Sequence, residues 1–227
     1  MNKIGTNHGG WDIPHSIDIN DNSIIYSGGV GEDISFDLIL SHKYNSKIYL
    51  IDPTKKSIQH LKEIKQFYNT KEWKFSGNIS KDYKKQIFNL TPNFDKITYI
   101  DIGLWNYKTK LKFYKQNNPK YVSQSIIPNM FGTNYDIIYT KTIKQIMDEY
   151  NHDKIDLLKL DIEGAEIEVL EQMLKDNIYP RYLCIEFDLF LKKKDKYNKT
   201  DILINKLIKK GYTILKNRKY NITFKLV

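Results

Sequence analysis

The sequence predicts one α/β domain, with a mostly parallel sheet that carries helices on both faces and ends in an antiparallel pair of strands. Two observations predict this class. Short apolar runs alternate with segments whose apolar residues recur at helical spacing over most of the 227 residues. The last two apolar runs, 212–215 and 221–227, have no helix between them, which predicts the antiparallel pair. No repeat or linker divides the chain, so residues 1–227 are expected to form a single domain, with 1–22 as an N-terminal extension.

The first half of the chain is expected to contain two units of a strand followed by a helix. Residues 23–26 form a short strand that ends in glycines, and the helix 33–42 follows it. The second strand, 47–51, ends at Asp52, and the helix 57–68 places its apolar residues on one stripe. Ligands of such sheets bind beyond the carboxyl ends of the strands, so the residues after each strand are the candidates for a site.

The second half is expected to continue the same pattern. Strands are predicted at 97–102, 110–114 (as the hairpin partner of 97–102), 155–160 and 181–187. Helices are predicted at 142–150, 165–176 and 200–210. Gly211 is a suitable C-terminal cap for the last helix. Two stretches do not fit the pattern, because 69–95 has no clean apolar period and 115–136 is a long polar loop.

The formal net charge of +9 and the pI of about 9.2 make RNA a candidate partner. The lysines are spread along the whole chain, however, and the only arginines are Arg181 and Arg218. Arginine is the preferred bidentate contact for phosphates and guanines. The lysine run 192–194 is expected to be a solvated loop. An RNA-directed function therefore stays open as the alternative and is not favoured.

Membrane and redox signals are weak in this sequence. No stretch of about 18 apolar residues is present, so neither a membrane span nor membrane contact is expected. The polar residues 1–10 carry no apolar signal core, which indicates a cytoplasmic protein. Cys184 is the single cysteine, and its place in an apolar run predicts a small buried side chain. The sequence does not predict the oligomeric state.

The first strand runs into a glycine-rich turn, Ser27-Gly28-Gly29-Val30-Gly31-Glu32-Asp33, and then into a helix. Glycines let a backbone approach a ligand closely, and free N–H groups stand at the helix start. The third glycine of the dinucleotide pattern is missing, because Ile34 stands in its place, so a nicotinamide-dependent oxidoreductase is a less favoured alternative. Glu32 and Asp33 would also repel a pyrophosphate, and a cationic nucleoside fits better. Asp33 alone also fits an ordinary first-turn acid.

A carboxylate follows the second strand. Asp52 stands about 20 residues after the glycines and precedes Pro53, a spacing that suits a side chain accepting hydrogen bonds from both ribose hydroxyls of a nucleoside. An Asp before a Pro is common in any turn. The prediction therefore rests on the turn and Asp52 occurring together on successive strands.

The apolar strand 155–160 ends in a group of acids. Asp161 and Glu163 would share one side of an extended chain, and Gly164 permits a tight entry into the next helix. Glu166 lies in the first turn of that helix, where we interpret it as an acid that stabilises the helix terminus. Asp161 or Glu163 could remove a proton from a substrate hydroxyl or orient it.

A metal site is the less favoured interpretation of these acids. Glu186 and Asp188 end the next strand and, with Asp161, could bind a divalent cation through oxygen atoms. Their spacing is not a metal signature, and the histidines do not pair in a zinc pattern. No metal-binding residues are therefore predicted.

At these residues the chain resembles the FkbM methyltransferase family. The resemblance rests on the segment 156–170 and extends to the glycine turn, 52–54, 103–105 and 123–125. It implies a Rossmann-like class I methyltransferase domain, S-adenosylmethionine as methyl donor, and an oxygen acceptor on a small molecule or a glycan. The RNA alternative is then an RNA methyltransferase or an RNA-binding protein that uses the basic surface. Residues 69–95 and 115–136 would form a lid or acceptor-side insertions.

The resemblance also implies roles for individual residues. Ser27, Gly29, Gly31 and Glu32 would bind the donor, Asp52 would hold its ribose, and Gly103 and Leu104 would line the donor site with Leu104 near the adenine. Asp161 and Glu163, already identified at the acidic strand end, are the catalytic candidates. Many methyltransferases carry an acid where Ser27 stands, and Glu32 is expected to take over the task of that acid. The family-like residues 9–11 either cover the acceptor pocket or anchor the N-terminus through Trp11.

Overall fold

A computed structural model gives the structure of the chain and describes residues 1–118, 121–191, 193–219 and 221–227. Its main sheet has the strand order β12-β13-β11-β10-β3-β4-β5. These strands are β3 (Ile24–Gly28), β4 (Lys47–Ile51), β5 (Ile97–Ile100), β10 (Leu157–Leu160), β11 (Tyr182–Glu186), β12 (Tyr212–Arg218) and β13 (Asn221–Leu226). The pairs from β5 to β11 are parallel, and β13 is antiparallel to both β11 and β12. The mostly parallel sheet with its final antiparallel pair is confirmed.

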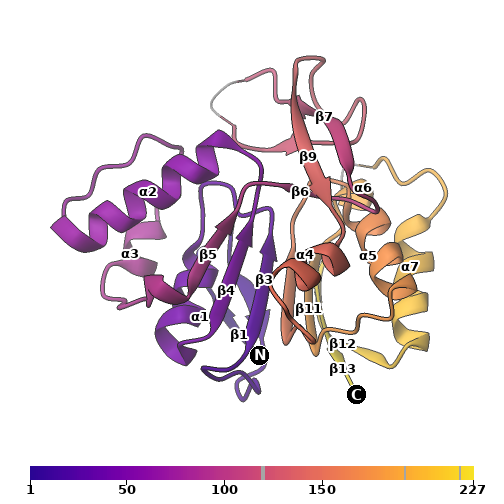
Figure 1. The fold of residues 1–227 in the computed structure, drawn as a ribbon, viewed down its shortest axis with the longest axis horizontal. Coiled ribbons are helices and arrows are strands. Elements are labelled where there is room, and N and C mark those ends of the chain that lie inside the picture. The colour runs from indigo at the N-terminus through magenta and orange to yellow at the C-terminus, as the bar shows by residue number, and fades with distance from the viewer. Residues whose placement is uncertain (119–120, 192, 220) are drawn as a thin grey trace.

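Helices cover both faces of this sheet (Figure 1). One face carries α1 (Ser35–Tyr44), α2 (Lys55–Thr70) and α3 (Tyr83–Ile87), and the other carries α4 (Ile143–Glu149), α5 (Glu166–Lys175) and α7 (Lys199–Lys209). Successive side chains of a strand point to opposite faces of the sheet, so each face has its own hydrophobic core. Ile25 packs in the cluster that contains Phe36 of α1, whereas Tyr26, its neighbour, packs in the cluster that contains Leu170 of α5. Short α6 (Asp188–Leu191) follows β11.

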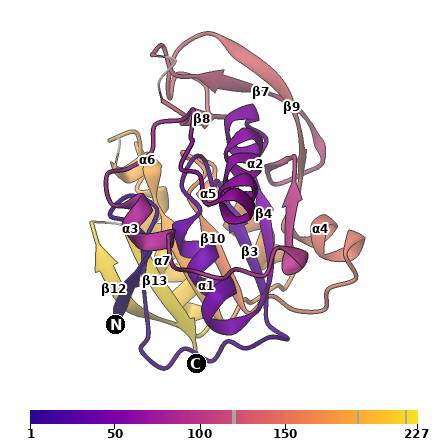
Figure 2. The ribbon, with the colours of Figure 1, turned by 90° about the vertical axis from the view of Figure 1, so that its left-hand side faces the viewer.

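A second sheet lies beyond the carboxyl ends of the main strands, at the top of Figure 1 and of Figure 2. Its order is β6-β9-β7-β8, formed by β6 (Gly103–Leu104), β7 (Thr109–Lys115), β8 (Gln124–Ser125) and β9 (Tyr135–Lys141). The sequence predicts only the strand within β7, as a hairpin partner of the strand 97–102, and a loop over 115–136. That loop in fact contains β8 and the start of β9, because cross-strand partners far along the chain complete the sheet. The predicted pairing is wrong, because β7 pairs with β8 and β9 in the second sheet.

The N-terminal extension is part of the packed structure. β1 (Asn2–Ile4) pairs with β2 (Trp11–Ile13), and Trp11 is 5% exposed in the core on the α1 face. The anchoring role of Trp11 is thus confirmed, while Gly9 lies at the rim of the cavity described below. Cys184 is fully buried as predicted, and burial raises the pKa of its thiol to about 12.

The segment 69–95 lacks an apolar period because aromatic side chains organise it. Phe67 at the end of α2 contacts Trp73, and Trp73 and Phe75 have ring centroids 4.6 Å apart. Tyr83 of α3 is fully buried beside them, and the single turn η1 (Phe94–Lys96) leads into β5. Contacts between aromatic rings stabilise this segment, and such contacts do not require apolar residues at a regular helical spacing. For this reason the segment shows no apolar period in the sequence.

Two further predictions concern single segments. Lys194 is exposed as expected of a solvated loop, yet its ammonium donates to the carbonyl oxygens of Asn129 and Met130, so it fixes a neighbouring loop. Lys192, in the same run, lies outside the described residues. Within the described ranges, no helix has the length and apolar character that crossing a membrane requires.

Candidate functional site

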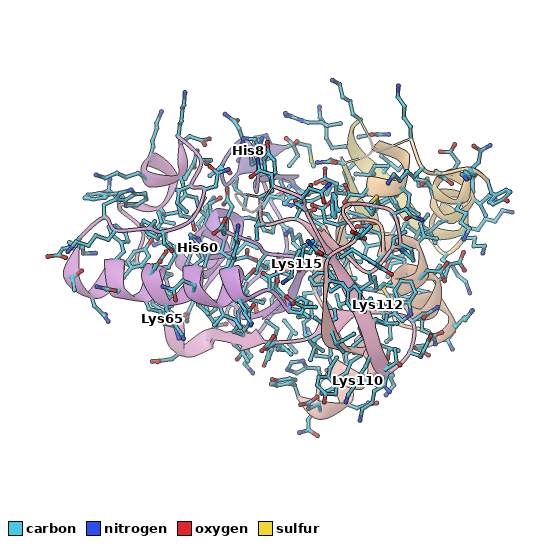
Figure 3. The ribbon with its side chains drawn as sticks, turned by 90° about the horizontal axis from the view of Figure 1, so that it is seen from above. His8, His60, Lys65, Lys110, Lys112 and Lys115 are labelled. Atoms are coloured by element: carbon cyan, nitrogen blue, oxygen red, sulfur yellow. The ribbon has the colours of Figure 1, made fainter. Side chains whose placement is uncertain are left out.

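A cavity of about 770 Å³ opens at the carboxyl ends of β3, β4, β10 and β11, beneath the second sheet. Cavities of roughly 300–1,000 Å³ are typical of small-molecule sites. Figure 3 looks down on this end of the molecule. The predicted site residues that line the cavity are Gly29, Gly31, Glu32, Asp52, Gly103, Leu104, Asp161 and Glu163. The remaining one, Ser27, does not line it.

Ser27 points into the protein instead of toward a ligand. Its side chain is fully buried and faces Asp37 of α1. Burial raises the pKa of Asp37 to about 6, and the charge of Lys159 opposes that rise. Ser27 therefore does not face the cavity in which its donor contact is predicted, because strand alternation turns its side chain beneath α1.

The glycine turn contacts the acid-bearing strand end through backbone atoms. Gly29 has φ +71°, and a Cβ there would lie 1.7 Å from the carbonyl oxygen of Asp161. The Asp161 N–H donates to the Gly28 carbonyl at 3.1 Å, and the Gly29 N–H donates to the Ile51 carbonyl at 3.0 Å. Gly29 is thus required by a close approach of two backbones, in addition to any approach of a ligand.

Asp52 holds the turn in place. One carboxylate oxygen accepts the N–H groups of Val30 at 3.0 Å and Gly31 at 2.9 Å, and the other accepts that of Thr54 at 2.7 Å. A carboxylate has about four acceptor positions. These three bonds leave one, so Asp52 can accept one ribose hydroxyl, where the sequence spacing predicts two.

Glu32 and Asp33 form the rim of the turn and join it to other segments. The Glu32 carboxylate accepts the Asn78 N–H at 3.3 Å, which connects the turn to the stretch 69–95. Asp33 accepts the Ser35 N–H at 3.0 Å, as a first-turn acid does, and also accepts the Thr6 hydroxyl. The N-terminal segment is therefore fastened to the turn, and this contact brings Gly9 to the cavity wall.

The acid turn 161–164 is not extended, contrary to the prediction from alternation. Glu163 adopts φ +58° and Gly164 φ +104°. One carboxylate oxygen of Glu166 accepts the N–H groups of Ile162 at 3.0 Å and Gly164 at 3.1 Å, and this folds the chain before α5. Asp161 and Glu163 nevertheless line the same cavity. Burial and the charge of Asp188 raise the pKa of Glu166 well above its usual range.

Two charged residues outside the predicted donor and catalytic sets complete the floor: Glu186, considered from the sequence only as a metal ligand, and Lys159, which the sequence does not single out. Burial, with the charges of Asp161, Asp188 and Glu163, raises the pKa of Glu186 to about 8. Lys159 opposes that rise; it is 3% exposed and its ammonium donates to the Gly29 carbonyl at 2.6 Å. A lysine inside an apolar strand is the signal that could have identified it, because a buried charge needs partners.

The metal arrangement considered from the sequence is not formed. In the part of the chain that the structure describes, no group of three or more His, Cys, Asp or Glu side chains is placed to hold a metal ion. Glu186 and Asp188 line the cavity with Asp161.

A family model for the methyltransferase FkbM domain matches residues 21–214. The chain belongs to this family. The crystal structure of Methyltransferase FkbM from Methylobacillus flagellatus KT resembles this FkbM domain with a TM-score of 0.50 at 15% sequence identity, covering 92% of this chain. At that identity the likeness shows the fold alone, and this FkbM domain spans 44% of the length of that protein. No curated protein matches the sequence.

The family match supports neither the RNA alternative nor the nicotinamide alternative. In this FkbM domain, the segment 121–130 forms one wall of the cavity, with Tyr121, Val122 and Ile126 facing the space. Lys56 donates to the Tyr121 carbonyl at 3.0 Å. The Ser125 hydroxyl donates to the Glu163 carbonyl at 2.6 Å, so this wall is joined to the acid turn.

Proposed function

We propose that this FkbM domain transfers a methyl group from S-adenosylmethionine to a hydroxyl oxygen of a small molecule or sugar. The observation that carries the proposal is that one cavity contains the glycine turn, Asp52 and the acids Asp161 and Glu163. A donor held by the turn and an acceptor held by the acids would lie in the same enclosed space, which is the condition for in-line transfer.

The residues of the turn fit this donor. Asp52 has one acceptor position left for a ribose hydroxyl, and the apolar side chains Ile102 and Leu104 form a wall suited to a flat base. The carboxylates around the cavity favour a ligand with positive charge. When bound, S-adenosylmethionine would supply an electrophilic methyl group next to its sulfonium.

The acids of the floor divide into two roles in this proposal. A hydroxyl becomes a nucleophile when its proton is removed, and Asp161 would accept that proton. Glu186, with its pKa near 8, holds a proton at neutral pH and would donate a hydrogen bond to the acceptor. When the surroundings give two neighbouring carboxyl groups different pKa values, the group with the higher pKa can donate a proton or hydrogen bond and the other can act as a base. Glu163 would orient the acceptor.

Calorimetry with the intact chain tests the donor. S-adenosylmethionine and its product S-adenosylhomocysteine should both bind with dissociation constants in the micromolar range. If neither binds, the proposal is wrong. Incubation of the protein and labelled donor with a panel of sugars and small hydroxylated compounds should then give a methyl ether, which mass spectrometry distinguishes from a methyl ester or amine.

A further inference from the structure

A smaller cavity of about 160 Å³, here called the side pocket, adjoins the main cavity. Its walls come from the N-terminal segment and from the β12–β13 hairpin, and they are Lys3, Asn7, His8, Gly10, Trp11, Asp12, Arg218, Asn221 and Thr223. Asn7, His8 and Asn221 line both cavities, so the two spaces share a wall. A ligand in the main cavity can therefore extend toward the side pocket.

Strand register places the side pocket relative to the acids. Glu186 of β11 pairs with Asn221 of β13, and Asn221 pairs with Arg218 of β12. Directly paired residues point to the same face of a sheet. Asp161 continues β10 in the same row. The backbones of Arg218 and Asp161 are therefore three strand spacings apart across the sheet, which is about 14 Å. Both side chains extend into this distance and shorten it.

The guanidinium of Arg218 is held so that one edge remains available. Its Nε lies 2.6 Å from one oxygen of Asp12, and one Nη donates to the other oxygen at 3.0 Å. Arginine has five N–H donors, and this bidentate pair uses two of them. The remaining edge suits a second planar or tetrahedral anion. The other arginine, Arg181, contacts Asp18 and Asp156 instead.

Charge is separated between the two cavities. The main cavity carries Asp161, Glu163, Glu186 and Asp188. Among the described residues that line the side pocket, Asp12 is the only acid, and Arg218 occupies both of its oxygens.

Lys3 adds a second cation to the lining of the side pocket. The Lys3 ammonium uses one donor on the Asn7 carbonyl at 3.0 Å and has further donors. Figure 3 shows His8 toward the opposite edge of the view from Lys110 of β7.

We propose that the side pocket binds an anionic substituent of the acceptor, a carboxylate or a phosphate, while the hydroxyl to be methylated lies beside Asp161. The acceptor class is then an acidic or phosphorylated sugar. Repulsion from the carboxylates excludes such a group from the floor of the main cavity, and Arg218 and Lys3 attract it. This inference rests on the proposed function, because that proposal places the acceptor over the ends of β10 and β11.

Arginine side-chain NMR tests the side pocket directly. The chain has two arginines and therefore two Nε–H signals, and Arg218→Gln assigns them by removing one. The full-length protein is titrated at constant ionic strength with glucose 6-phosphate, glucuronate and glucose. The Arg218 signal should shift to saturation with an anionic sugar and stay unchanged with glucose, while the Arg181 signal stays fixed. The sugar that saturates at the lower concentration identifies the preferred anion.

Variants sharpen the test. Arg218→Lys keeps the charge but loses the planar fork, and Lys3→Gln removes a charge. In calorimetric titrations with the preferred anionic sugar, each should weaken binding about tenfold. Lys209→Gln, at the end of α7 on the other face of the sheet, is the matched control and should bind as the wild type does. No saturable shift at Arg218 with either anionic sugar, or an equal shift at Arg181, overturns the inference. Donor binding is measured in a separate calorimetric experiment. If S-adenosylhomocysteine binds but the anionic sugars do not, only this inference is wrong. If the anionic sugars bind but S-adenosylhomocysteine does not, only the proposed function is wrong.

Discussion

The two halves of the main cavity are built differently. On the side proposed to bind the donor, Gly29, Gly31 and Asp52 come from neighbouring segments, and backbone hydrogen bonds set the shape. On the side proposed to bind the acceptor, Asp161 and Glu186 are joined by the adjoining side pocket, whose residues come from distant parts of the chain, and side-chain charges set the chemistry. The donor half should therefore tolerate little change without loss of fold, whereas the acceptor half should change its chemistry with the fold intact.

The largest effect is expected for Gly29→Ala. A Cβ would overlap the Asp161 carbonyl oxygen at 1.7 Å, and left-handed backbone at a residue other than glycine costs roughly 1–3 kcal/mol on its own. Urea unfolding should show a loss larger than that range, with S-adenosylhomocysteine binding abolished. Gly211→Ala is the matched control, because it has φ +97° but its nearest contact is 3.5 Å away, so it should lose about 1 kcal/mol. Equal losses would contradict the backbone contact.

Asp161→Asn tests the other half. Turnover should fall by about 100-fold or more because the proton acceptor is lost, while donor affinity stays within several-fold of normal. Steady-state kinetics and calorimetry measure the two quantities. Asp148→Asn, which removes an exposed acid of α4 paired with Lys144, should change neither. Unchanged turnover in Asp161→Asn would remove Asp161 from its role as base.

Asp52→Ala should weaken donor binding about tenfold and lower stability by about 1–3 kcal/mol, because three backbone N–H groups lose their acceptor. Calorimetry with S-adenosylhomocysteine and urea unfolding give both numbers. A stability loss with full donor affinity would mean that Asp52 serves the turn alone.

The last prediction concerns the pH dependence of stability. The pKa of Glu186 is about 8 in the folded chain and its ordinary value is 4.5, so the unfolded chain releases this proton first. The contribution of Glu186 to stability is present at low pH and is lost as pH rises from about 4.5 to about 8. Glu186→Gln removes this dependence. Its Tm advantage over wild type should therefore grow by several °C between pH 5 and pH 8.5, at about 2–4 °C per kcal/mol. Glu149→Gln, at an exposed acid, is the control, and its Tm difference from wild type should be the same at both pH values. If Glu186→Gln also gives a constant Tm difference, the pKa of Glu186 is ordinary and the prediction is wrong.

The sequence predicts best what local pattern determines. The glycine turn, Asp52 and Asp161 each follow a predicted strand, and parallel strands bring their carboxyl ends together. For this reason the sequence already indicates one shared cavity, although which residues bind donor and acceptor remains a proposal.

What the sequence misses depends on contacts between distant segments. Lys159 reads as one residue of an apolar strand until Gly29 is placed beside it. The bonds of Asp52 to the turn, and the left-handed Glu163 held by Glu166, need three-dimensional closure. Arg218 meets Asp12 from the far end of the chain, which no local pattern reports.

The contact between Gly29 and the Asp161 carbonyl has a kinetic consequence. Since no side-chain carbon fits between these two stretches of main chain, we expect a displacement of one to displace the other. A nucleoside that draws the first loop inward would then also move the side chain proposed to accept the proton. We therefore expect an ordered sequence of substrate addition in which the sulfonium compound enters first and completes the place where the alcohol is received.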